Sequence, residues 1–456
     1  MARTVTQAEK AAFRANAPKP RMTRPPKPAN PQGVWLAAGV RTPFARAGGA
    51  LAKRDALALS TPVVRAMLAQ LQKEGGARPD LLVWGAVIPN LAMSNIAREV
   101  LLEAKGDPSI PAFSTVMACS TSMVGAFEAA GMLDDDRGRS LALVGGAEAM
   151  SRIQIGLGQG LSDELRRFME ARTLADRWAA LAALKPSDLK LFVPRIQNRV
   201  TGKSMGEHTE EMAKGWEISR EEQDELAFAS HSRAAAAWER GFFDDLVLRL
   251  DDVGRDTTVR ADTSLEKLAK LSPAFDRTSG KGTLTAGNSS PLTDGAAAVW
   301  VGTANGLDRL PTGTPRVRLV DFEVNAIDLF NEYLLMAPAY AIPRLLLRNG
   351  LTYEDVGLWE IHEAFTAQVA THIKALQDPK FLKEKAGVKP GFGRFPVERM
   401  NPNGGSTALG HPFGATGARI LSQAVRELAA EPPGTYAIVS ICADGGQGAV
   451  ALLQNG

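Results

Sequence analysis

The chain has 456 residues, of which 45% are hydrophobic and 23% are charged, and its formal net charge is +3. This composition is typical of a globular protein of two to four domains, and it excludes a disordered chain and a bundle of membrane-spanning helices. The two cysteines and five histidines are not clustered, which excludes a disulfide framework and gives no expectation of a metal site.

Residues 1–32 are rich in proline and in positive charge. They hold seven basic residues and one acid, so the remainder has 46 basic and 49 acidic residues and is slightly negative. We predict a flexible tail, with no apolar stretch of a secretory signal and no aromatic residues placed for nucleic-acid binding. A mitochondrial presequence is the alternative, weakened by the prolines and the lack of serine. We therefore expect the cytoplasm of a bacterium, with the mitochondrial matrix as the alternative.

From Val34 onward, short apolar strands alternate with alanine-rich helices. An example is "VWLAAGV", followed by "DALALSTPVVRAMLAQLQKEG" and "LLVWGAVI". The strands are apolar on both sides, which is typical of a sheet covered by helices on both faces. The sequence therefore predicts an α/β fold.

Two parts of the chain share one pattern. Asp80 and Trp84 at the start of an apolar strand are repeated 275 positions later as Asp355 and Trp359. Each part continues through a Gly- and Ser-rich turn into a helix of small residues, and then into a strand that ends in glycines. The repetition predicts two similar α/β halves packed together.

A segment of different character, residues 152–203, separates these parts. It carries ten basic and five acidic residues, and "LSDELRRFMEARTLADRWAALAALK" predicts one or two amphipathic helices. Their apolar residues are Leu161, Leu165, Phe168 and Met169, followed by Leu174, Trp178 and Leu181. Two interpretations stay open: the helices cover their own domain, or they form a basic surface for a partner, a membrane or a phosphorylated ligand.

Cys119 lies in "TVMACSTSM", where an apolar strand turns into a helix. The positive end of a helix lowers the pKa of a thiol and favours the thiolate, so Cys119 is a candidate nucleophile. The alternative is a small buried hydrophobic residue, which is the usual role of a free cysteine.

Two histidines are candidates for the same chemistry. His362 follows an apolar strand, where α/β sheets concentrate ligand-binding residues, although it could also be a structural histidine at a helix start. His411 lies in "NPNGGSTALGHPFGATGAR", whose glycines indicate a tightly folded loop. A histidine held in such a loop is a candidate base for deprotonating a thiol.

Cys442 lies in "CADGGQG", a strand end followed by glycines whose N–H groups could face an anion. Two thiols with two histidines suggest that one thiol carries an acyl group while the other moves a proton. An acyl thioester with an acidified α-carbon requires this division of labour.

At these residues the chain resembles the thiolases, the acetyl-CoA acyltransferases, from Val34 to the C-terminus. The motifs "VRTPFAR", "CSTS", "GNSSPLTDGAAA", "HEAF", "GHPFGATG" and "CADGGQG" follow one another in the family order. The "HEAF" motif and the basic segment make it most similar to the β subunits of trifunctional fatty-acid oxidation complexes.

The resemblance implies a role for each candidate. Cys119 would take the acyl group, His411 would activate it, and Cys442 would be the acid and base at the acetyl-CoA methyl carbon. His362 would stand in an oxyanion hole for the substrate carbonyl, and Glu363 would orient that region.

It also implies binding groups. The backbone N–H groups of Cys119 and Asp444 would form a second oxyanion hole. Ser290 would contact the pantetheine arm of CoA, and Met205 would lie near the CoA pocket. CoA would be a substrate, with no cofactor and no metal.

Asp444 departs from the family, which usually has glycine at this position. A carboxylate turned inward would raise the pKa of Cys442 and oppose an enolate. We therefore predict that the Asp444 side chain points away and hydrogen-bonds to the backbone.

The implied fold has five layers, α-β-α-β-α, built from two similar halves with an inserted helical loop domain. The expected divisions are a tail at 1–32, an N-terminal half at 33–150 plus 286–308, a CoA-binding loop domain at 151–285 and a C-terminal half at 309–456. The basic excess of the loop domain would suit the phosphates of CoA.

The implied function is thiolysis of 3-ketoacyl-CoA by CoA, or the reverse Claisen condensation. The alternatives are a condensing enzyme of the ketoacyl-synthase type, or a docking subunit of a β-oxidation complex. Expected partners are a second copy of the chain in a homodimer or a dimer of dimers, a hydratase/dehydrogenase α subunit, and a membrane surface contacted through 152–203.

Overall fold

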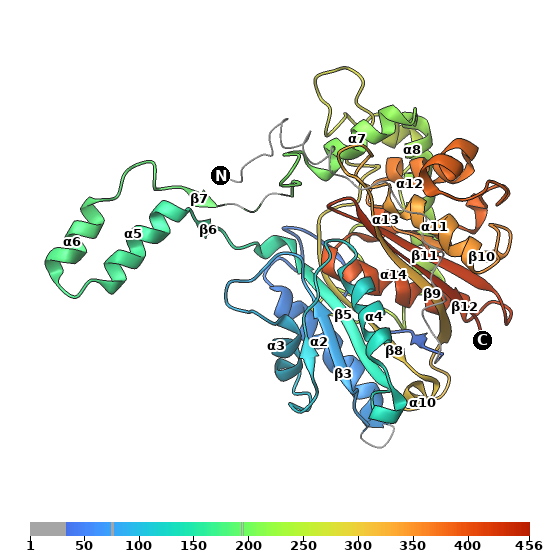
Figure 1. Cartoon of the computed structure of the whole chain (residues 1–456), viewed down its shortest axis with the longest axis horizontal. Helices are drawn as coiled ribbons and strands as arrows, with labels where there is room; N and C mark the ends of the chain where they lie inside the picture. The colour runs from blue at the N-terminus through green and yellow to red at the C-terminus, as the bar shows by residue number, and fades with distance from the viewer. Residues whose placement is uncertain (1–32, 74–76, 193, 195) are drawn as a thin grey trace.

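A computed structural model of the chain describes residues 33–456 except 74–76, 193 and 195 (Figure 1). The tail expected at 1–32 lies outside the described residues. Among those described, no helix combines the length and the apolar character that a membrane crossing requires.

One mixed sheet forms the frame of the molecule, and its described part has ten strands. Their order is β10 (Val356–Ile361), β11 (Tyr436–Ala443), β12 (Gln447–Gln454), β9 (Arg316–Ala326), β1 (Trp35–Ala37), β8 (Thr293–Gly302), β5 (Leu141–Ala149), β3 (Leu81–Gly85) and β4 (Ala112–Phe113), with β2 (Ala45–Arg46) paired to β8.

The strand pairing repeats between the two halves of the sheet. In the first half, β5 is parallel to β3 and antiparallel to β8, and in the second half β11 is parallel to β10 and antiparallel to β12. Strand β1 pairs antiparallel with both β8 and β9 and so joins the halves. Trp84 and Trp359 occupy the equivalent strands β3 and β10, and both are fully buried. The prediction of two similar halves is confirmed.

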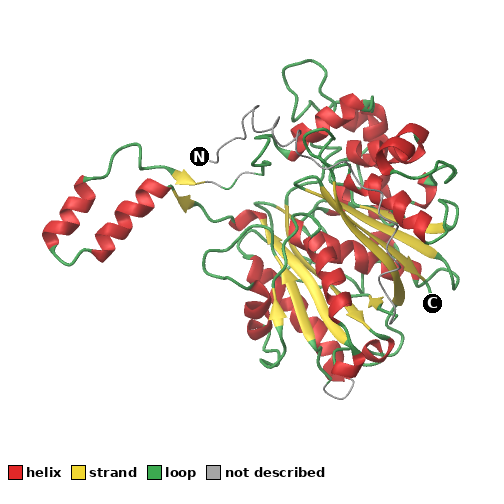
Figure 2. Cartoon of the chain, in the orientation of Figure 1, coloured by secondary structure: helices red, strands yellow, loops and turns green. Residues whose placement is uncertain are grey.

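Helices cover both faces of each half (Figure 2). The helices α4 (Thr121–Met132) and α14 (Phe413–Leu428) pack on each other in the centre, within a core that draws side chains from both halves. Outside the first half lie α2 (Ala56–Lys73) and α3 (Ile96–Glu103), and outside the second lie α11 (Ala337–Arg348) and α12 (Thr366–Gln377). These are the five layers that the resemblance implied.

The remaining helices lie in connections and in the loop domain. They are α7 (Met205–Gly215), α8 (Arg220–Glu239), α9 (Leu265–Ala269), α10 (Ala304–Leu307) and α13 (Ser406–Leu409), the 3-10 turns η1 (Asp135–Arg137), η2 (Met150–Arg152) and η4 (Val397–Arg399), and the π-helical turn η3 (Phe381–Ala386). Helices α7 and α8 pack against α12, and this contact holds the loop domain beside the second half.

Residues 153–197 are called the arm below, and its part from β6 (Gly156–Leu157) to β7 (Leu191–Phe192) extends away from the body of the molecule (Figure 1). A two-stranded ribbon of β6 and β7 leads to α5 (Gln159–Glu170) and α6 (Leu174–Ala182), which pack on each other. Among the described residues of the arm, Ala180 alone is buried. Leu161, Leu165 and Phe168 of α5 are half-buried, whereas Leu174, Trp178 and Leu181 of α6 are exposed. The helices therefore pack mainly on each other, and the two interpretations of this segment stay predictions.

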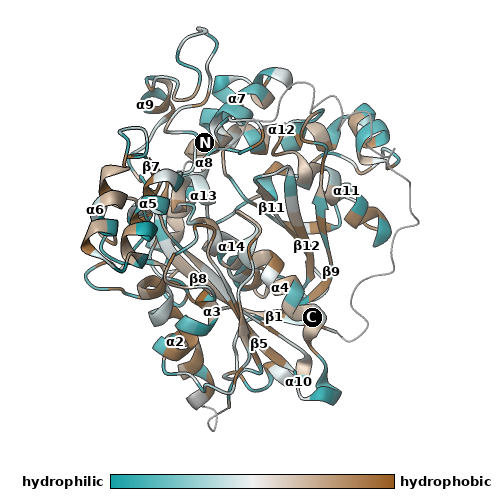
Figure 3. Cartoon of the chain, turned by 60° about the vertical axis from the view of Figure 1, so that its left-hand side comes forward, coloured by the Kyte–Doolittle hydropathy of each residue, from teal (hydrophilic) through white to brown (hydrophobic). Residues whose placement is uncertain are grey.

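The exposed residues of the arm include large apolar side chains. Trp178 is 71% exposed and Leu174 is 73% exposed, and Met169 at the end of α5 is 77% exposed. Figure 3, which brings the arm toward the viewer, shows hydrophobic residues on α6. An exposed surface of this kind usually marks a site of interaction.

The central helices touch where glycine replaces a side chain, and this predicts a large effect of a small substitution. A Cβ at Gly417 of α14 would lie 2.3 Å from the backbone nitrogen of Met123 in α4. We expect Gly417→Ala to lower the free energy of unfolding by about 1–3 kcal/mol, because backbone must move. Denaturant unfolding followed by circular dichroism measures this change.

Gly131, also in α4, is the matched control. A Cβ there would meet no atom within 4 Å, so Gly131→Ala should be neutral or should raise the free energy of unfolding by up to about 1 kcal/mol through helix propensity. Equal stability of the two variants would contradict the close packing of α4 and α14.

Candidate active site

A cavity of about 450 Å³ lies where the two halves and the loop domain meet. Cys119, His411 and Cys442 line one part of it, and most of the remaining wall is apolar. Cys119 comes from the turn between β4 and α4, His411 from the loop between α13 and α14, and Cys442 from β11. The candidates from both halves therefore share one cavity.

Cys119 and His411 are in direct contact. The His411 Nε2 lies 3.2 Å from the Cys119 Sγ, and its Nδ1 lies 2.7 Å from the Thr416 Oγ1. The Thr416 hydroxyl donates to the Pro412 carbonyl, so it accepts from Nδ1–H. This leaves the lone pair of Nε2 facing the thiol, as a general base for Cys119 requires.

The resting Cys119–His411 pair is neutral, contrary to the expectation of a lowered pKa at Cys119. Desolvation raises the pKa of the Cys119 thiol well above its ordinary value, and negative charge at Cys442, Asp444 and Glu148 raises it further. Burial, together with the positive charge of Arg419, lowers the pKa of His411 to about 3.

These pKa shifts predict how Cys119 reacts with an alkylating reagent. Since the thiol pKa is raised and the imidazole pKa is lowered, the thiolate fraction should grow about tenfold for each unit of pH. We expect the alkylation rate of Cys119 by iodoacetamide to rise from pH 6 to pH 9 without a plateau. Mass spectrometry of the Cys119 peptide separates this signal from Cys442, whose pKa burial raises to about 12. A plateau across pH 5–8 would indicate a preformed thiolate–imidazolium pair and would contradict the prediction.

His362 follows β10 and lies beside His411, with ring centroids 4.2 Å apart and the ring planes tilted by 52°. Its Nδ1 lies 2.9 Å from the Ser406 Oγ, which accepts a hydrogen bond from Arg419. Within the described part of the chain, Nδ1 is the one acceptor found for the Ser406 hydroxyl hydrogen, and this favours the tautomer of His362 with its proton on Nε2. Among the described residues, this buried Nε2 has no hydrogen-bond partner. It is a donor available to a carbonyl oxygen in the cavity.

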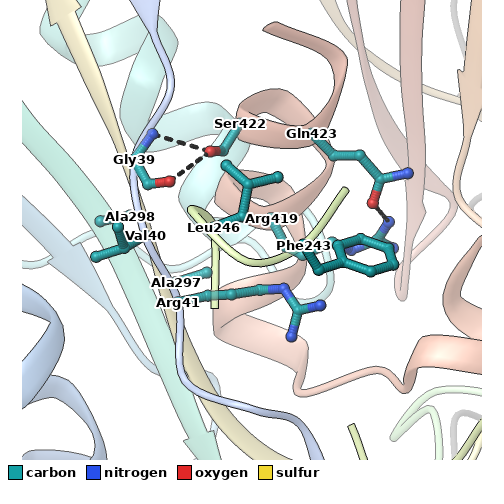
Figure 4. Close-up of a pocket in the computed structure, with 10 residues that line it drawn as sticks. All are labelled: Gly39, Val40, Arg41, Phe243, Leu246, Ala297, Ala298, Arg419, Ser422 and Gln423. Carbon is teal, nitrogen blue, oxygen red and sulfur yellow. Dashed lines mark hydrogen bonds between the residues drawn. The ribbon is translucent and has the colours of Figure 1, made fainter. Parts of the chain in front are cut away.

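Arg419 is a buried charge whose guanidinium hydrogen-bonds the Gln423 side chain (Figure 4) and the Ser406 hydroxyl. Burial lowers its pKa to about 10, so it stays protonated at neutral pH. Its charge lowers the pKa of both His362 and His411, in addition to the larger effect of desolvation. Both imidazoles are therefore neutral, one as an acceptor and the other as a donor.

The Asp444 side chain is held by hydrogen bonds, as predicted. Its Oδ1 accepts from the Gly445 N–H at 2.6 Å, and also from the Asn198 side chain at 2.8 Å, which the sequence did not predict. The described structure has no hydrogen bond between this carboxylate and the Cys442 sulfur. Asp444 nevertheless lines the cavity and raises the pKa of Cys119.

Glu363 is buried beside His362 and fixes the loop that precedes His411. Its carboxylate accepts hydrogen bonds from the Asn401 side chain, the Ser230 hydroxyl and the Thr407 N–H. A Cβ at Gly405 would lie 2.3 Å from this carboxylate, which explains the glycine there.

The two residues expected to bind CoA line the same cavity. Ser290 lies in the loop that precedes β8, and its N–H donates to the Ala364 carbonyl. Met205 is the first residue of α7. Both residues are therefore within reach of a ligand in the cavity, and their roles in CoA binding stay predictions.

Sequence reasoning missed Glu148, at the end of β5. Its carboxylate accepts N–H bonds from Val87, Ile88 and Gly414 and so ties three segments together behind the cavity. Burial raises its pKa to about 7. A carboxylate in "LALVGGAEAM", at the end of a wholly apolar strand, was the signal that could have identified it. Thr416 and Ser406, which set the histidine tautomers, carried no such signal.

Comparison with known proteins extends this picture along the chain. A family profile described as thiolase, N-terminal domain, matches residues 34–305, and one described as thiolase, C-terminal domain, matches residues 313–455. A 3-ketoacyl-CoA thiolase of Yersinia enterocolitica is 37% identical over 436 residues, covering 92% of this chain and 96% of that protein. One from Erwinia tasmaniensis is 38% identical over 430 residues, with the same coverage.

Solved structures show the same architecture. The acetyl-CoA acetyltransferase of Bacillus anthracis superposes with a TM-score of 0.73 at 29% identity, over 93% of this chain and 98% of its own. The Acat5 thiolase of Ascaris suum in complex with coenzyme A superposes with a TM-score of 0.74 at 25% identity, over 93% of this chain and 100% of its own.

Proposed function

This chain belongs to the thiolase family, and we propose that it is an acyltransferase that cleaves 3-ketoacyl-CoA with CoA. The products are acetyl-CoA and an acyl-CoA shortened by two carbons, and the reverse reaction is a Claisen condensation. The observation that carries this proposal is the Cys119 thiol 3.2 Å from a neutral His411 base, with a second thiol, Cys442, in the same cavity.

In the first half of the reaction, the Cys119 sulfur attacks the 3-keto carbon and its proton passes to His411 Nε2. The bond between carbons 2 and 3 then breaks, which leaves the acyl group as a thioester on Cys119. The electron pair goes to the leaving acetyl-CoA carbon, which takes a proton from the Cys442 thiol.

In the second half, the Cys442 thiolate takes the proton of an incoming CoA thiol, and the CoA sulfur attacks the Cys119 thioester. Cys119 leaves as a thiolate and recovers its proton from His411. Both thiols and the imidazole return to their neutral starting forms, in agreement with the pKa shifts of the resting site.

Negative charge develops on two carbonyl oxygens during these steps. The free Nε2–H of His362 is suited to stabilise the enolate oxygen of acetyl-CoA. The backbone N–H groups of Cys119 and Asp444 are proposed for the oxygen of the Cys119 intermediate. Ser290 and Met205 are proposed to contact CoA, which enters as a substrate.

The second thiol favours this reaction over the alternatives. A condensing enzyme of the ketoacyl-synthase type would use a second histidine in place of the second thiol. A subunit that serves only for docking would have no need of the intact set of Cys119, His362, His411 and Cys442.

The walls of the cavity favour a long acyl chain as the substrate tail. Apolar side chains that line the cavity include Ile88, Ile153, Phe275 and Leu335, and Ile153 begins the arm. On the ribbon of the arm, Leu157 pairs with Leu191, so their side chains share one exposed face. The base of the arm is therefore proposed as the outer wall of the acyl-chain site.

Thiolysis of 3-ketoacyl-CoA substrates of increasing chain length tests this proposal. We expect acetyl-CoA to form, and kcat/KM to rise about fourfold for each added methylene group that is buried, which corresponds to about 0.8 kcal/mol. Ile153→Ala should reduce the rise for long chains, whereas Leu174→Ala on α6 should leave the profile unchanged. Absence of thiolysis would overturn the function, and a profile that is flat in the wild type would overturn the acyl-chain site alone.

The proposal extends to assembly and location. The chain is proposed to act as a homodimer or a dimer of dimers, together with a hydratase/dehydrogenase subunit, in the cytoplasm of a bacterium. On α6, Leu174, Trp178 and Leu181 lie on one exposed face. This face is proposed to make a peripheral contact with a membrane surface, because Trp suits the boundary between lipid and water.

A further inference from the structure

Asp444 lies in the turn between β11 and β12, two residues after Cys442 and in the wall of the cavity. A carboxylate at this place opposes the chemistry proposed for the site, because the reaction generates negative charge on both sulfurs and on the enolate. The direction of the Asp444 side chain is therefore important for the reaction. Two donors hold it: the Gly445 N–H at 2.6 Å and the Asn198 Nδ2 at 2.8 Å, both on Oδ1.

The Gly445 N–H is a local donor, since it belongs to the neighbouring residue. Asn198 is distant in sequence, 246 positions away, and belongs to the segment in which the arm returns to the body. Among the described residues, the Asn198 side chain forms the hydrogen bond that links this segment to the turn after Cys442.

Asn198 is itself rigidly held. It is 5% exposed, and its Oδ1 accepts from the Val200 and Thr201 N–H groups, each at 3.0 Å. Its backbone N–H donates to the Lys203 carbonyl, and its carbonyl accepts from the Gly202 N–H. These bonds close a tight turn over residues 198–203, so the direction of the Asn198 Nδ2 is fixed before it meets Asp444.

The same turn leads directly into the cavity wall. Ser204 follows it, caps α7 with its side chain, and lines the cavity together with Met205 and Asp444. One short segment therefore joins the base of the arm, the cavity wall and the Cys442 loop. A shift of this segment moves the donor that orients Asp444.

We propose that Asn198 is a positioning residue for the thiolase reaction, acting through Asp444 on the loop of the acid/base thiol Cys442. The Asn198 donor keeps the Asp444 carboxylate in its hydrogen bond with the Gly445 N–H and away from the Cys442 sulfur. The inference rests on the proposed function, because it concerns the proton transfer assigned to Cys442.

The substitution Asn198→Asp isolates the interaction. Aspartate retains the oxygen that accepts from Val200 and Thr201 but replaces the Nδ2 donor by an oxygen facing the Asp444 carboxylate. Asp444→Gly removes the carboxylate and with it the need for the donor. The two single variants and the double variant form a double-mutant cycle.

We expect Asn198→Asp to lower kcat for thiolysis at least tenfold, because small misplacements of catalytic groups are costly. The exchange of the acetyl-CoA methyl protons with D₂O should fall by a similar factor. The KM for CoA and the alkylation rate of Cys119 should change less than twofold. In the Asp444→Gly background, Asn198→Asp should change kcat less than twofold.

A purely structural role for Asn198 would give a different result. The loss would then be equal in both backgrounds, or the alkylation rate and thermal stability would fall together with kcat, and either result would overturn the proposal. Thr201→Val is the matched control, since Thr201 lies in the same turn but contacts His208. If Asn198→Asp does not fold, Asn198→Ser, which also lacks the Nδ2 donor, replaces it in the double-mutant cycle with Asp444→Gly. Failure of the proposed function is distinguishable, because the wild type would then show neither thiolysis nor exchange.

Discussion

Replacing Cys119 by alanine is expected to abolish thiolysis, with a loss in kcat of about 10⁴-fold or more. The acyl group would have no sulfur on which to form a thioester, and removal of the nucleophile from a site of this kind leaves only the contribution of binding and charge stabilisation. The assay mixes a 3-ketoacyl-CoA with CoA and measures the loss of the substrate and the formation of acetyl-CoA.

The variant should keep its fold and its affinity for CoA, because alanine removes only the sulfur of a half-buried side chain. Mass spectrometry of the wild type after mixing with an acyl-CoA should show the acyl mass on the peptide that contains Cys119, and on no peptide of the variant. Full activity of Cys119→Ala would refute the assignment of the nucleophile.

Replacing Cys442 by alanine is expected to give the second largest loss, about 10³-fold in kcat, which is within the range of a lost general acid and base. The reason is that the acetyl-CoA carbanion would find no proton donor and the CoA thiol no base. The exchange of acetyl-CoA methyl protons with D₂O should disappear to the same extent, since that exchange requires only the acid/base group.

Alkylation of Cys119 by iodoacetamide provides the control. It should proceed in Cys442→Ala at no less than half the wild-type rate, because the Cys119–His411 contact does not include Cys442. Retained methyl-proton exchange in this variant would contradict the role given to Cys442 and would direct attention to Glu148 and the two histidines.

The neutral state of the site gives these predictions a common basis. Cys119 and Cys442 both have raised pKa values, and His411 and His362 have lowered ones, chiefly because all are removed from water. On these four groups, charge therefore appears only when a substrate is bound and a proton moves. Catalysis then depends on close placement of these groups. The contacts of Thr416 and Ser406 orient the two histidines, and Asn198 is proposed to orient Asp444.

Much of the candidate site could be predicted from the sequence because each residue has a local signal. Cys119 and Cys442 are rare residues at strand ends, and His411 lies among glycines that allow a tight loop. The roles of these residues came from the resemblance to a family. The prediction of a lowered pKa for Cys119 failed because a local argument about a helix end does not include desolvation by distant segments.

The supporting residues could not be predicted in this way. Thr416, Ser406 and Asn198 are ordinary polar residues whose importance comes from the atoms that they contact. The Asn198–Asp444 contact joins residues 246 positions apart. The location of the arm was also undetermined by the sequence. The amphipathic pattern of α5 and α6 fits two arrangements equally well: a helix pair packed on the body, and a helix pair whose two helices pack only on each other.

The sequence by itself determined the α/β class and the two similar halves, and it indicated the candidate reacting groups, because strand burial, repetition and rare residue types are local properties of the chain. Only the tertiary structure decided which of these groups meet, which tautomer each histidine adopts, and where the Asp444 carboxylate points. The physical reason is that hydrogen-bond direction and desolvation depend on all neighbours of an atom, and in this protein those neighbours come from both halves and from the arm.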